Sequence, residues 1–530
     1  MRTRREFVAG AAPLVFVRKA AAQARTRPNI LWISCEDMSP TLGCYGDTYA
    51  HSPNLDKFAA QGQRYTHAFS VAGVCAPSRS GIITAMYPTS IGTHHMRSKG
   101  VPPSYVRCFT EYLREEGYYA SNNVKTDYNF DVPLTAWDEV SNKAHWRGRA
   151  KGQPFFSVFN FTTTHESQIR ADEQTLAAHR ARFDAKYLHD PAKAPVPPYF
   201  PDTPVVRRDI ANHYDTITSM DAQVGGVLRQ LEEDGLAENT MVFFWSDHGW
   251  GMPRGKRWIY DSGVRVALMV RAPGVTRAGS VTNRLVSLID LGPTAMSLAG
   301  IKPPEYMQGK AFLGPHEAPA ADKLYFVRDR MDETYDMIRG VRDHRYKYLR
   351  NYQWQKPYAQ FISYMDEMPT LKEWRRLHAA GKLVGPQRNF FAPEKPKEEL
   401  YDTAKDPHEV VNLADSPEHR MVLERMRMAH ERWTRETGDL GHIPEAELQE
   451  RWRPGGKWSK TEKPVIRKEG GLARITCATE GASIGWTVEA GEKPAWKVYK
   501  DGVRVEAGKR LRARAVRLGF EESEEAAMEF

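Results

Sequence analysis

Four mainly apolar runs, each followed by polar or charged residues, dominate the first half of the chain. They cover residues 28–34, 154–161, 240–245 and 266–270. Runs of this length are typical of strands that are buried on both faces of a parallel sheet. Segments with the apolar spacing of helices cover residues 55–61, 80–86, 109–116, 209–231 and 285–299. Strands that alternate with helices predict an α/β fold, in which a mostly parallel central sheet is flanked by helices.

The pattern changes twice toward the C-terminus. Residues 324–327 and 346–349 are typical of antiparallel strands, and a helix is predicted over 416–436. Beyond a linker at 453–456, short strands separated by turns begin at about residue 463 and indicate a small β-sandwich. Because 530 residues are too many for one ordinary core, we expect several domains. The expected domains are an α/β domain over 25–324, a smaller α+β subdomain with an antiparallel sheet over 325–455, and a terminal β-sandwich over 463–530.

The N-terminus has the features of an export signal. Arg4 and Arg5, followed by Glu6-Phe7-Val8, resemble a twin-arginine motif, and a modest apolar stretch reaches residue 17. Ala22-Gln23-Ala24 fits a small-x-small cleavage site. We therefore expect residues 1–24 to be a signal peptide of a bacterial protein exported to the periplasm or the medium; a disordered basic tail is the alternative. No run of eighteen apolar residues occurs, so no transmembrane segment is expected in the mature chain.

Charge and cysteine content narrow the class further. The net charge is +9, of which residues 1–24 contribute +4 (five basic minus one acidic), leaving about +5. This mild excess suits an anionic substrate, and no basic run with interleaved aromatic residues indicates nucleic-acid binding. The five cysteines are odd in number and irregularly spaced, which argues against a disulfide framework or a zinc site. Nothing in the composition indicates an oligomeric state.

Polar residues follow three of the predicted strands at their C-terminal ends. Glu36 and Asp37 follow the first strand, His165 follows the second, and Asp247 and His248 follow the third. In open α/β sheets these ends meet at one edge, so the side chains can converge. Three carboxylates together suit one hard divalent cation such as calcium. The alternative is that each pair is an unrelated pair of loop residues.

The segment Cys75-Ala76-Pro77-Ser78-Arg79 carries the sharpest resemblance. It matches the C-x-P-S-R signature of type I, formylglycine-dependent sulfatases of the alkaline phosphatase-like superfamily. The resemblance implies that a formylglycine-generating enzyme oxidises Cys75 to 3-oxoalanine. A hydrated aldehyde carries two hydroxyls, one to attack sulfur and one to expel sulfate afterwards. Arg79 lies one helical turn from Cys75 and would face the same pocket; Ala85 and Met86 depart from the family's usual Gly and Arg.

Three further segments resemble the same family in order and spacing. Lys125 matches a lysine that contacts sulfate, although Asp127 stands where a histidine is usual, so either Asp127 or another group helps to collapse the intermediate. His165 matches the histidine that contacts sulfate or protonates the leaving group, and Lys256 matches a second sulfate-contacting lysine. The resemblance thus implies a catalytic set of Cys75, Arg79, Lys125, His165 and Lys256. It implies a cation site of Glu36, Asp37, Cys75, Asp247 and His248, holding one Ca²⁺ or, alternatively, Mg²⁺.

The expected function is hydrolysis of sulfate esters or sulfamates, with a sulfated carbohydrate or glycosaminoglycan fragment as substrate. Mild basicity, export and the terminal segment, which resembles a module at the end of some chitobiases, favour this substrate, and the chain also resembles heparan N-sulfatase-like members. A phosphodiester or phosphonate monoester hydrolase of the same superfamily is one alternative. A catalytically silent glycan-binding protein is another, disfavoured because clustered charges destabilise a protein that has no ligand for them.

Overall fold

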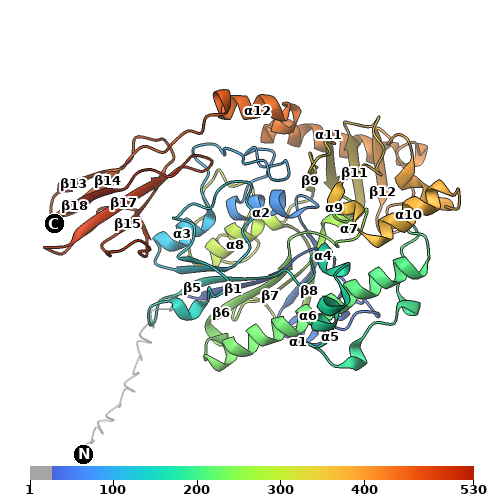
Figure 1. The fold of residues 1–530 in the computed structure, drawn as a ribbon, viewed down its shortest axis with the longest axis horizontal. Coiled ribbons are helices and arrows are strands. Elements are labelled where there is room, and N and C mark those ends of the chain that lie inside the picture. The colour runs from blue at the N-terminus through green and yellow to red at the C-terminus, as the bar shows by residue number, and fades with distance from the viewer. Residues whose placement is uncertain (1–26) are drawn as a thin grey trace, which may run out of the picture.

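The computed structural model describes residues 27–530, so the signal segment predicted over 1–24 lies outside the described residues. An eight-stranded sheet forms the centre of the molecule, with the order β4-β3-β5-β1-β6-β7-β2-β8 (Figure 1). Its strands are β1 (Asn29–Cys35), β2 (Gln63–Phe69), β3 (Tyr119–Asn123), β4 (Glu139–Val140), β5 (Phe155–Phe161), β6 (Thr240–Ser246), β7 (Arg265–Arg271) and β8 (Ser280–Ser287). Only β7 runs antiparallel to its neighbours within this sheet, which confirms the prediction of a mostly parallel sheet.

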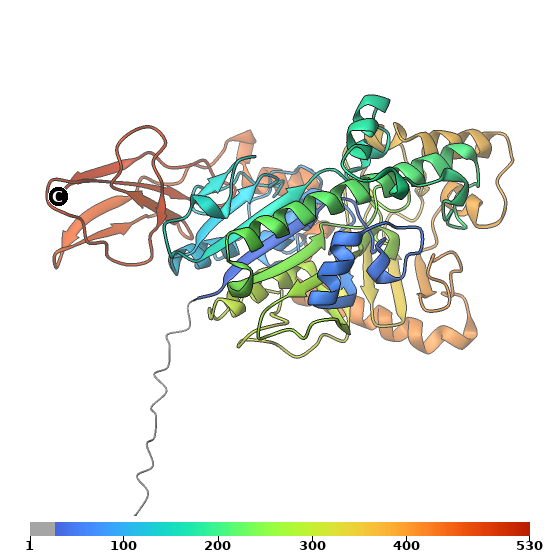
Figure 2. The same ribbon diagram turned by 90° about the horizontal axis from the view of Figure 1, so that it is seen from below.

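Helices cover both faces of this sheet because the buried strands are apolar on both sides. In β1, Ile30 and Trp32 pack toward one face, while Leu31 and Ile33 pack toward the other. The first face is covered by α2 (Cys75–Thr84), α3 (Phe109–Glu115) and α8 (Leu291–Leu298). The second is covered by α1 (Pro53–Gln61) and α6 (Pro204–Glu233), which lie in front of the sheet in Figure 2. The short helices α4 (Glu166–Ile169), α5 (Glu173–Arg180) and α7 (Asp261–Val264) lie in the connecting segments.

Three helix predictions were wrong in their bounds, and the helix expected over 209–231 begins earlier, at Pro204. The helix expected over 80–86 begins five residues earlier, at Cys75, because Pro77 lies in the first turn, where no backbone N–H is needed. The helix expected over 285–299 is a strand up to Ser287, where β8 pairs with β2, and becomes helical only from Leu291. The earlier start of α2 matters for the site, since it makes Cys75 the first residue of that helix.

A second, antiparallel sheet follows the first. It has the order β12-β11-β10-β9 and consists of β9 (Leu324–Arg328), β10 (Ile338–Arg342), β11 (Tyr346–Asn351) and β12 (Glu398–Asp402). The long helix α11 (Arg420–Thr437) packs on β10 and β11, and α9 (Ser363–Asp366), α10 (Pro369–Ala379) and α12 (Glu445–Trp452) complete this part. Buried Arg339 pairs with Asp329 at 2.9 Å and with Asp439 at 2.6 Å, which fastens the chain after α11 to the sheet.

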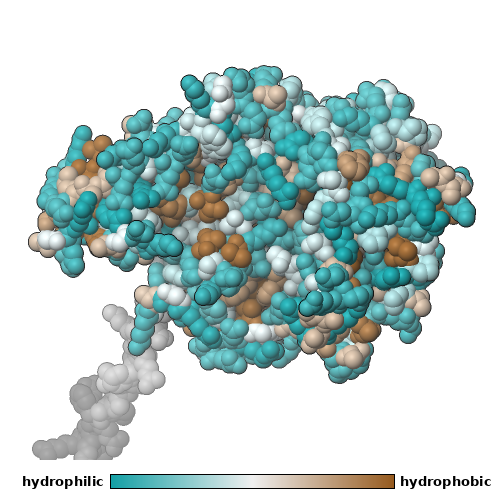
Figure 3. All heavy atoms as spheres, viewed as in Figure 1, coloured by the Kyte–Doolittle hydropathy of each residue, from teal (hydrophilic) through white to brown (hydrophobic). Residues whose placement is uncertain are grey.

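The last residues form two small antiparallel sheets that share one apolar core. One pairs β13 (Val465–Glu469) with β14 (Leu472–Thr476), and the other contains β15 (Ser483–Thr487), β16 (Lys497–Val498), β17 (Arg510–Val516) and β18 (Ala526–Glu529). They pack beside α3, where Arg114 donates to the carbonyl of Trp496 and Arg107 Nε donates to Ser483 Oγ at 3.1 Å. The surface is mostly hydrophilic, with apolar groups gathered over α3 and α8 (Figure 3). Within residues 27–530, no helix has both the length and the apolar character that crossing a membrane requires.

Candidate active site

The polar residues predicted at the strand ends do lie together. Strands β3, β5, β1 and β6 are neighbours and run parallel, so their C-terminal ends share one edge of the sheet. Cys35 of β1 pairs with Ser246 of β6, which places the residues that follow side by side. The backbone N–H of Asp37 therefore reaches Asp247 Oδ1 at 3.3 Å. The other members of this edge, which we call the polar cluster, are Glu36, Cys75, Arg79, Lys125, His165, His248 and Lys256.

Cys75 occupies the first turn of α2, at the centre of the polar cluster. Its side chain is buried, and its Sγ lies 3.4 Å from His248 Nε2 and 4.0 Å from Asp37 Oδ1. The positive end of the α2 dipole points toward this position, so a negative oxygen here would be stabilised. Gly73, just before the helix, lets the chain approach Trp258 closely: a Cβ at Gly73 would lie 2.1 Å from the carbonyl oxygen of Trp258.

The guanidinium of Arg79 joins three strands of the sheet. Its Nε donates to Asp247 Oδ2 at 3.0 Å, its Nη1 donates to Asn160 Oδ1 at 3.0 Å, and its Nη2 lies 3.6 Å from Glu36 Oε1. Arg79 is only 4% exposed, so these contacts are little screened by water. Because a guanidinium is planar and always charged, it fixes the distances among these three partners.

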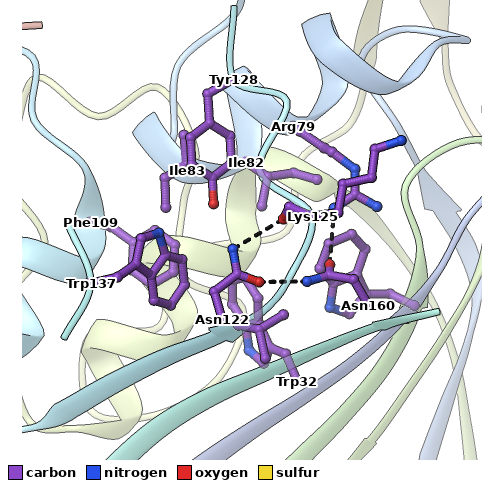
Figure 4. A pocket seen from close by; sticks show the side chains of 12 residues that line it. Trp32, Arg79, Ile82, Ile83, Phe109, Asn122, Lys125, Tyr128, Trp137 and Asn160 are labelled. Atoms are coloured by element: carbon purple, nitrogen blue, oxygen red, sulfur yellow. Dashed lines mark hydrogen bonds between the residues drawn. The ribbon is translucent and has the colours of Figure 1, made fainter. Parts of the chain in front are cut away.

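A chain of side-chain amides continues from Arg79 to the loop of Lys125 (Figure 4). Asn160 Nδ2 donates to Asn122 Oδ1 at 2.6 Å, and Asn122 Nδ2 donates to the carbonyl oxygen of Lys125 at 3.1 Å. Behind this chain lies a small cavity of about 30 Å³, whose walls are mainly aromatic and aliphatic side chains. The amide chain therefore separates the polar cluster from an apolar interior and holds Lys125 in place. Neither Asn122 nor Asn160 was predicted, since amides mid-strand give no signal in sequence.

The remaining cations pair with the two carboxylates that follow β1. Lys125 Nζ lies 2.7 Å from Glu36 Oε1, and Lys256 Nζ lies 2.6 Å from Asp37 Oδ2. His248 Nε2 is 2.9 Å from Asp37 Oδ1, whereas His165 Nε2 is 3.9 Å from Glu36 Oε2. The structure thus brings every residue of both predicted sets into one cluster.

Burial and pairing shift the acidities of these groups in opposite directions. Burial opposes ionisation of Asp37, yet Lys256 and His248 hold its pKa well below the usual range. Burial also opposes a charge on His248, but Asp247 and Asp37 outweigh it and raise its pKa to about 10. Burial and the nearby Lys256 lower the pKa of His165, so its imidazole is mostly neutral at neutral pH.

The donor set of the polar cluster fits a hard divalent cation. Potential ligand atoms of Glu36, Asp37, Cys75 and His165 lie within 4.8 Å of one another, and so do those of Cys75, Asp247 and His248. Glu36 Oε2 is buried without a hydrogen-bond partner, whereas Oε1 forms an ion pair with Lys125. Carboxylate oxygens are the ligands that calcium and magnesium prefer.

A buried ion pair supports the cluster from one side and was not predicted. Glu166 accepts two hydrogen bonds of 2.8 Å from Arg257 and lies 3.1 Å from Lys256. Burial opposes its charge, but Arg257 and Lys256 lower the pKa of Glu166 to about 2. Glu166 follows His165 and Arg257 follows Lys256 in the sequence, and this adjacency is the signal that could have identified them. Their pairing fixes the position of Lys256 relative to Asp37.

Asp127 and the histidine pair at 94–95 lie outside this arrangement. Asp127 Oδ2 is 3.8 Å from Lys125 Nζ, at the solvent side of the cluster. His94 and His95 are buried beside Asp329, and their burial lowers both pKa values to about 4. Of these, only Asp127 is close enough to Lys125 to influence the cluster directly.

Comparison with known proteins decides the family. The sequence profile of the Sulfatase family matches residues 28–143 and 121–301, and these ranges contain every residue of the polar cluster. The chain belongs to the sulfatase family. The profile described as N-sulphoglucosamine sulphohydrolase, C-terminal, matches residues 246–371. These matches confirm the family resemblance that starts at Cys75.

Named relatives of this sulfatase act on sulfated glycans. An ulvan-active sulfatase of Formosa agariphila is 42% identical over 94% of this chain and 90% of the relative. The human N-sulphoglucosamine sulphohydrolase is 27% identical over 81% of this chain and 95% of the relative. A solved structure bound to its substrate, D-glucosamine-2-N,6-O-disulfate, has the same fold, with a TM-score of 0.57, 15% identity, and coverage of 79% of this chain and 99% of the other.

Proposed function

We propose that this sulfatase hydrolyses sulfate esters or sulfamates carried by sulfated carbohydrates. The observation that carries the proposal is the polar cluster, in which Cys75 begins a helix among three cations, three carboxylates and two histidines. The relatives that act on ulvan and on N-sulphoglucosamine support a glycan substrate, since one of them matches almost the whole chain.

Cys75 would act after its oxidation to formylglycine by a formylglycine-generating enzyme. The hydrated aldehyde supplies one hydroxyl to attack sulfur and a second whose deprotonation expels sulfate. The residues of this chain would hold the sulfate group for that attack. Arg79, Lys125 and Lys256 are obligate or strongly favoured cations in the cluster, because the pKa values of both lysines are raised by their anionic neighbours against the opposing effect of burial. They would offset the charge of the sulfate oxygens.

His165 would contact the leaving group. Its Nδ1 lies 3.4 Å from the backbone N–H of Ser167 and 2.9 Å from Ser167 Oγ, and accepting from this N–H would place the proton of the neutral imidazole on Nε2. That nitrogen points toward the cluster, 3.9 Å from Glu36 Oε2. A neutral histidine with its proton on Nε2 can donate to the oxygen or nitrogen that departs from sulfur.

Glu36, Asp37, Asp247 and His248, together with the oxidised side chain of Cys75, would hold one divalent cation, with Ca²⁺ as our proposal and Mg²⁺ as the alternative. The bound ion would supply a Lewis acid that orients sulfate and lowers the pKa of the attacking hydroxyl. Carboxylates of this number favour calcium because it accepts more oxygen ligands than magnesium. Calcium also tolerates irregular geometry, which suits a site that combines an aspartate pair with the longer Glu36.

Export and domain organisation complete the proposal. The twin-arginine segment would direct a folded protein to the periplasm or the medium, and oxidation of Cys75 would then precede export, while the chain is still unfolded. The expected boundaries at 25–324, 325–455 and 463–530 are supported by the change from the central sheet to the second sheet and then to the terminal sheets. Mass spectrometry of the Cys75 peptide from cytoplasmic precursor would detect the aldehyde if this order holds.

The deciding experiment is hydrolysis of a defined panel by purified protein whose Cys75 peptide shows formylglycine. The panel contains O-sulfated and N-sulfated mono- and disaccharides, together with a phosphonate monoester and a phosphodiester. We expect turnover of at least one sulfated sugar that exceeds turnover of the phosphorus compounds. Cys75→Ala should abolish turnover and leave the circular dichroism spectrum unchanged. Faster hydrolysis of the phosphorus compounds, or full activity with an intact thiol, would refute the proposal.

A further inference from the structure

Solvent reaches only some members of the polar cluster. Among its members, Lys125 and His165 have side chains that are 22% and 21% exposed, and neighbouring Asp127 is 27% exposed. The side chains of Arg79 and Lys256, by contrast, are at most 4% exposed. A substrate whose sulfate enters the cluster must therefore leave the rest of its body against the surface around Lys125 and His165. What lies beside this entrance determines which substrate bodies fit.

Two exposed aromatic side chains lie on the segment 358–366, beside the entrance. Phe361 is 64% exposed and Tyr364 is 37% exposed, whereas Ile362 and Met365 between and after them are fully or almost fully buried. The buried pair anchors the segment in the core around α10, so the two aromatic side chains are held outward. Large aromatic side chains gain stability from burial, and two exposed ones within four residues mark a surface made for contact.

The position of this segment is set by the strand connection next to it. Glu333 Oε1 accepts a hydrogen bond of 2.6 Å from the backbone N–H of Ser363, and Thr334 Oγ1 donates to the carbonyl oxygen of Phe361 at 2.6 Å. Neighbouring Asp332 lies 3.9 Å from Arg257 Nε, the residue that supports Lys256. The aromatic segment is therefore linked to the polar cluster through short polar contacts.

Tyr364 lies beside the catalytic residue His165. Its ring centroid lies 6.2 Å from that of His165, with 50° between the planes. The guanidinium of Arg170 packs on the Tyr364 ring, 4.6 Å from its centroid, and is itself paired with Glu367. Arg170 thus fixes the ring from one side and leaves part of it open to solvent beside His165.

We propose that Tyr364, extended by Phe361, is a stacking surface for a pyranose ring of the substrate. The inference rests on the proposed function and adds the residue that recognises the sugar itself. The C–H face of a pyranose is apolar and matches an aromatic ring, while its hydroxyls suit the charged groups around it. A spacing of about 6 Å places such a ring next to His165, where the leaving atom must lie. Charged groups border this segment, since Glu333 binds Ser363 and the neighbouring Asp332 pairs with exposed Arg97 at 3.5 Å; they disfavour an apolar protein partner.

Steady-state kinetics with a cleaved sulfated disaccharide tests this proposal. Tyr364→Ala should raise KM about 10-fold, with kcat within about threefold, since stacking binds ground state and transition state alike. Tyr364→Trp should restore KM, because any flat aromatic ring can stack. Inhibition by inorganic sulfate should be unchanged in both variants, since sulfate occupies the cluster without a sugar. Met421→Ala, which removes an 83% exposed apolar side chain from α11, is the matched control and should change nothing.

The failure of this inference can be separated from failure of the proposed function. If the wild-type protein hydrolyses no sulfated sugar, the function fails, and calorimetric binding of the sulfated disaccharides of the panel to Cys75→Ala and to Cys75→Ala/Tyr364→Ala still tests the surface. Equal affinity of these two proteins would overturn the inference. The inference would also be overturned if Tyr364→Ala raised the inhibition constant of inorganic sulfate as much as it raised KM. Tyr364 would then act on the cluster rather than on the sugar.

Discussion

Replacing Arg79 by lysine separates the geometry of the polar cluster from its charge. The positive charge is kept, but the fork that bridges Asp247, Asn160 and Glu36 is lost. A lysine ammonium is a compact point charge on a flexible stem and cannot reproduce three contacts in one plane. The substitution therefore tests whether the arrangement of the cluster, rather than its net charge, supports turnover.

The magnitude follows from the two hydrogen bonds that Arg79 donates. The bond to ionised Asp247 is worth about 2 kcal/mol and the bond to the neutral amide of Asn160 about 1 kcal/mol, which gives about 3 kcal/mol. If the full amount is lost in the transition state, kcat/KM falls about 100-fold. If part of this free energy stabilises the folded protein instead, its loss would lower the thermal midpoint of unfolding. Both kcat/KM and the thermal midpoint are therefore measured on the same preparation.

The assay is hydrolysis of the best sulfated sugar of the panel, with differential scanning calorimetry alongside. Arg420→Lys is the control, since its side chain is 79% exposed on α11 and contacts only Glu424. We expect the control to match wild type in both measurements. An Arg79→Lys variant with kcat/KM within threefold of wild type and an unchanged thermal midpoint would refute the reasoning, because the fork would then serve no purpose that lysine cannot.

Three further predictions concern the ion, the supporting pair and pH. Calcium at 100 times its dissociation constant should stabilise the protein by about 3 kcal/mol, and chelation should reverse this; Asp247→Asn should remove the response. Glu166→Gln should destabilise the protein by about 3 kcal/mol in urea unfolding, because Arg257 is left buried and unpaired; a loss below 1 kcal/mol contradicts this. Burial raises the pKa of Glu409 to about 7, so the stability it contributes is complete below about pH 4.5 and falls by about 3 kcal/mol as pH rises through 7. Glu409→Gln should reduce this dependence of the unfolding free energy on pH. If urea unfolding at pH 5 and pH 8 gives the same change in unfolding free energy for wild type and variant, the assignment is contradicted.

The sequence predicted those parts of the fold that are locally encoded. Strands β1, β5 and β6 were found within about two residues, because each is a mainly apolar run, and the residues after them belong to the cluster. Strand β2 was missed because it is only half buried and is defined by pairing with β7 and β8. Strand β8 was taken for the start of a helix, since the apolar residues at its C-terminal end fit the spacing of a strand and that of a helix equally well.

The same distinction applies to the site. Cys75 and Lys256 carry motifs that are readable in one dimension, whereas Asn160 and Glu166 acquire their roles only through contacts with residues 81 and 91 positions away. Tyr364 shows the limit most clearly, because its nearness to His165 depends on the packing of α9, which lies between β11 and β12 of the second sheet. Partners that are brought together by the fold alone cannot be recovered from spacing along the chain.

The contact between Arg114 and the terminal sheets has a practical consequence for shortening this protein. The guanidinium binds Asp138, the carbonyls of the 134–135 turn and the carbonyl of Trp496, and Gly485 lies directly against the side chain of Leu134. Removing everything after residue 456 would expose an apolar side chain and leave an arginine one acceptor short, both on α3 and its adjoining turn. A shortened enzyme should therefore be prone to aggregation and poorly soluble unless Leu134 is replaced by a polar residue at the same time.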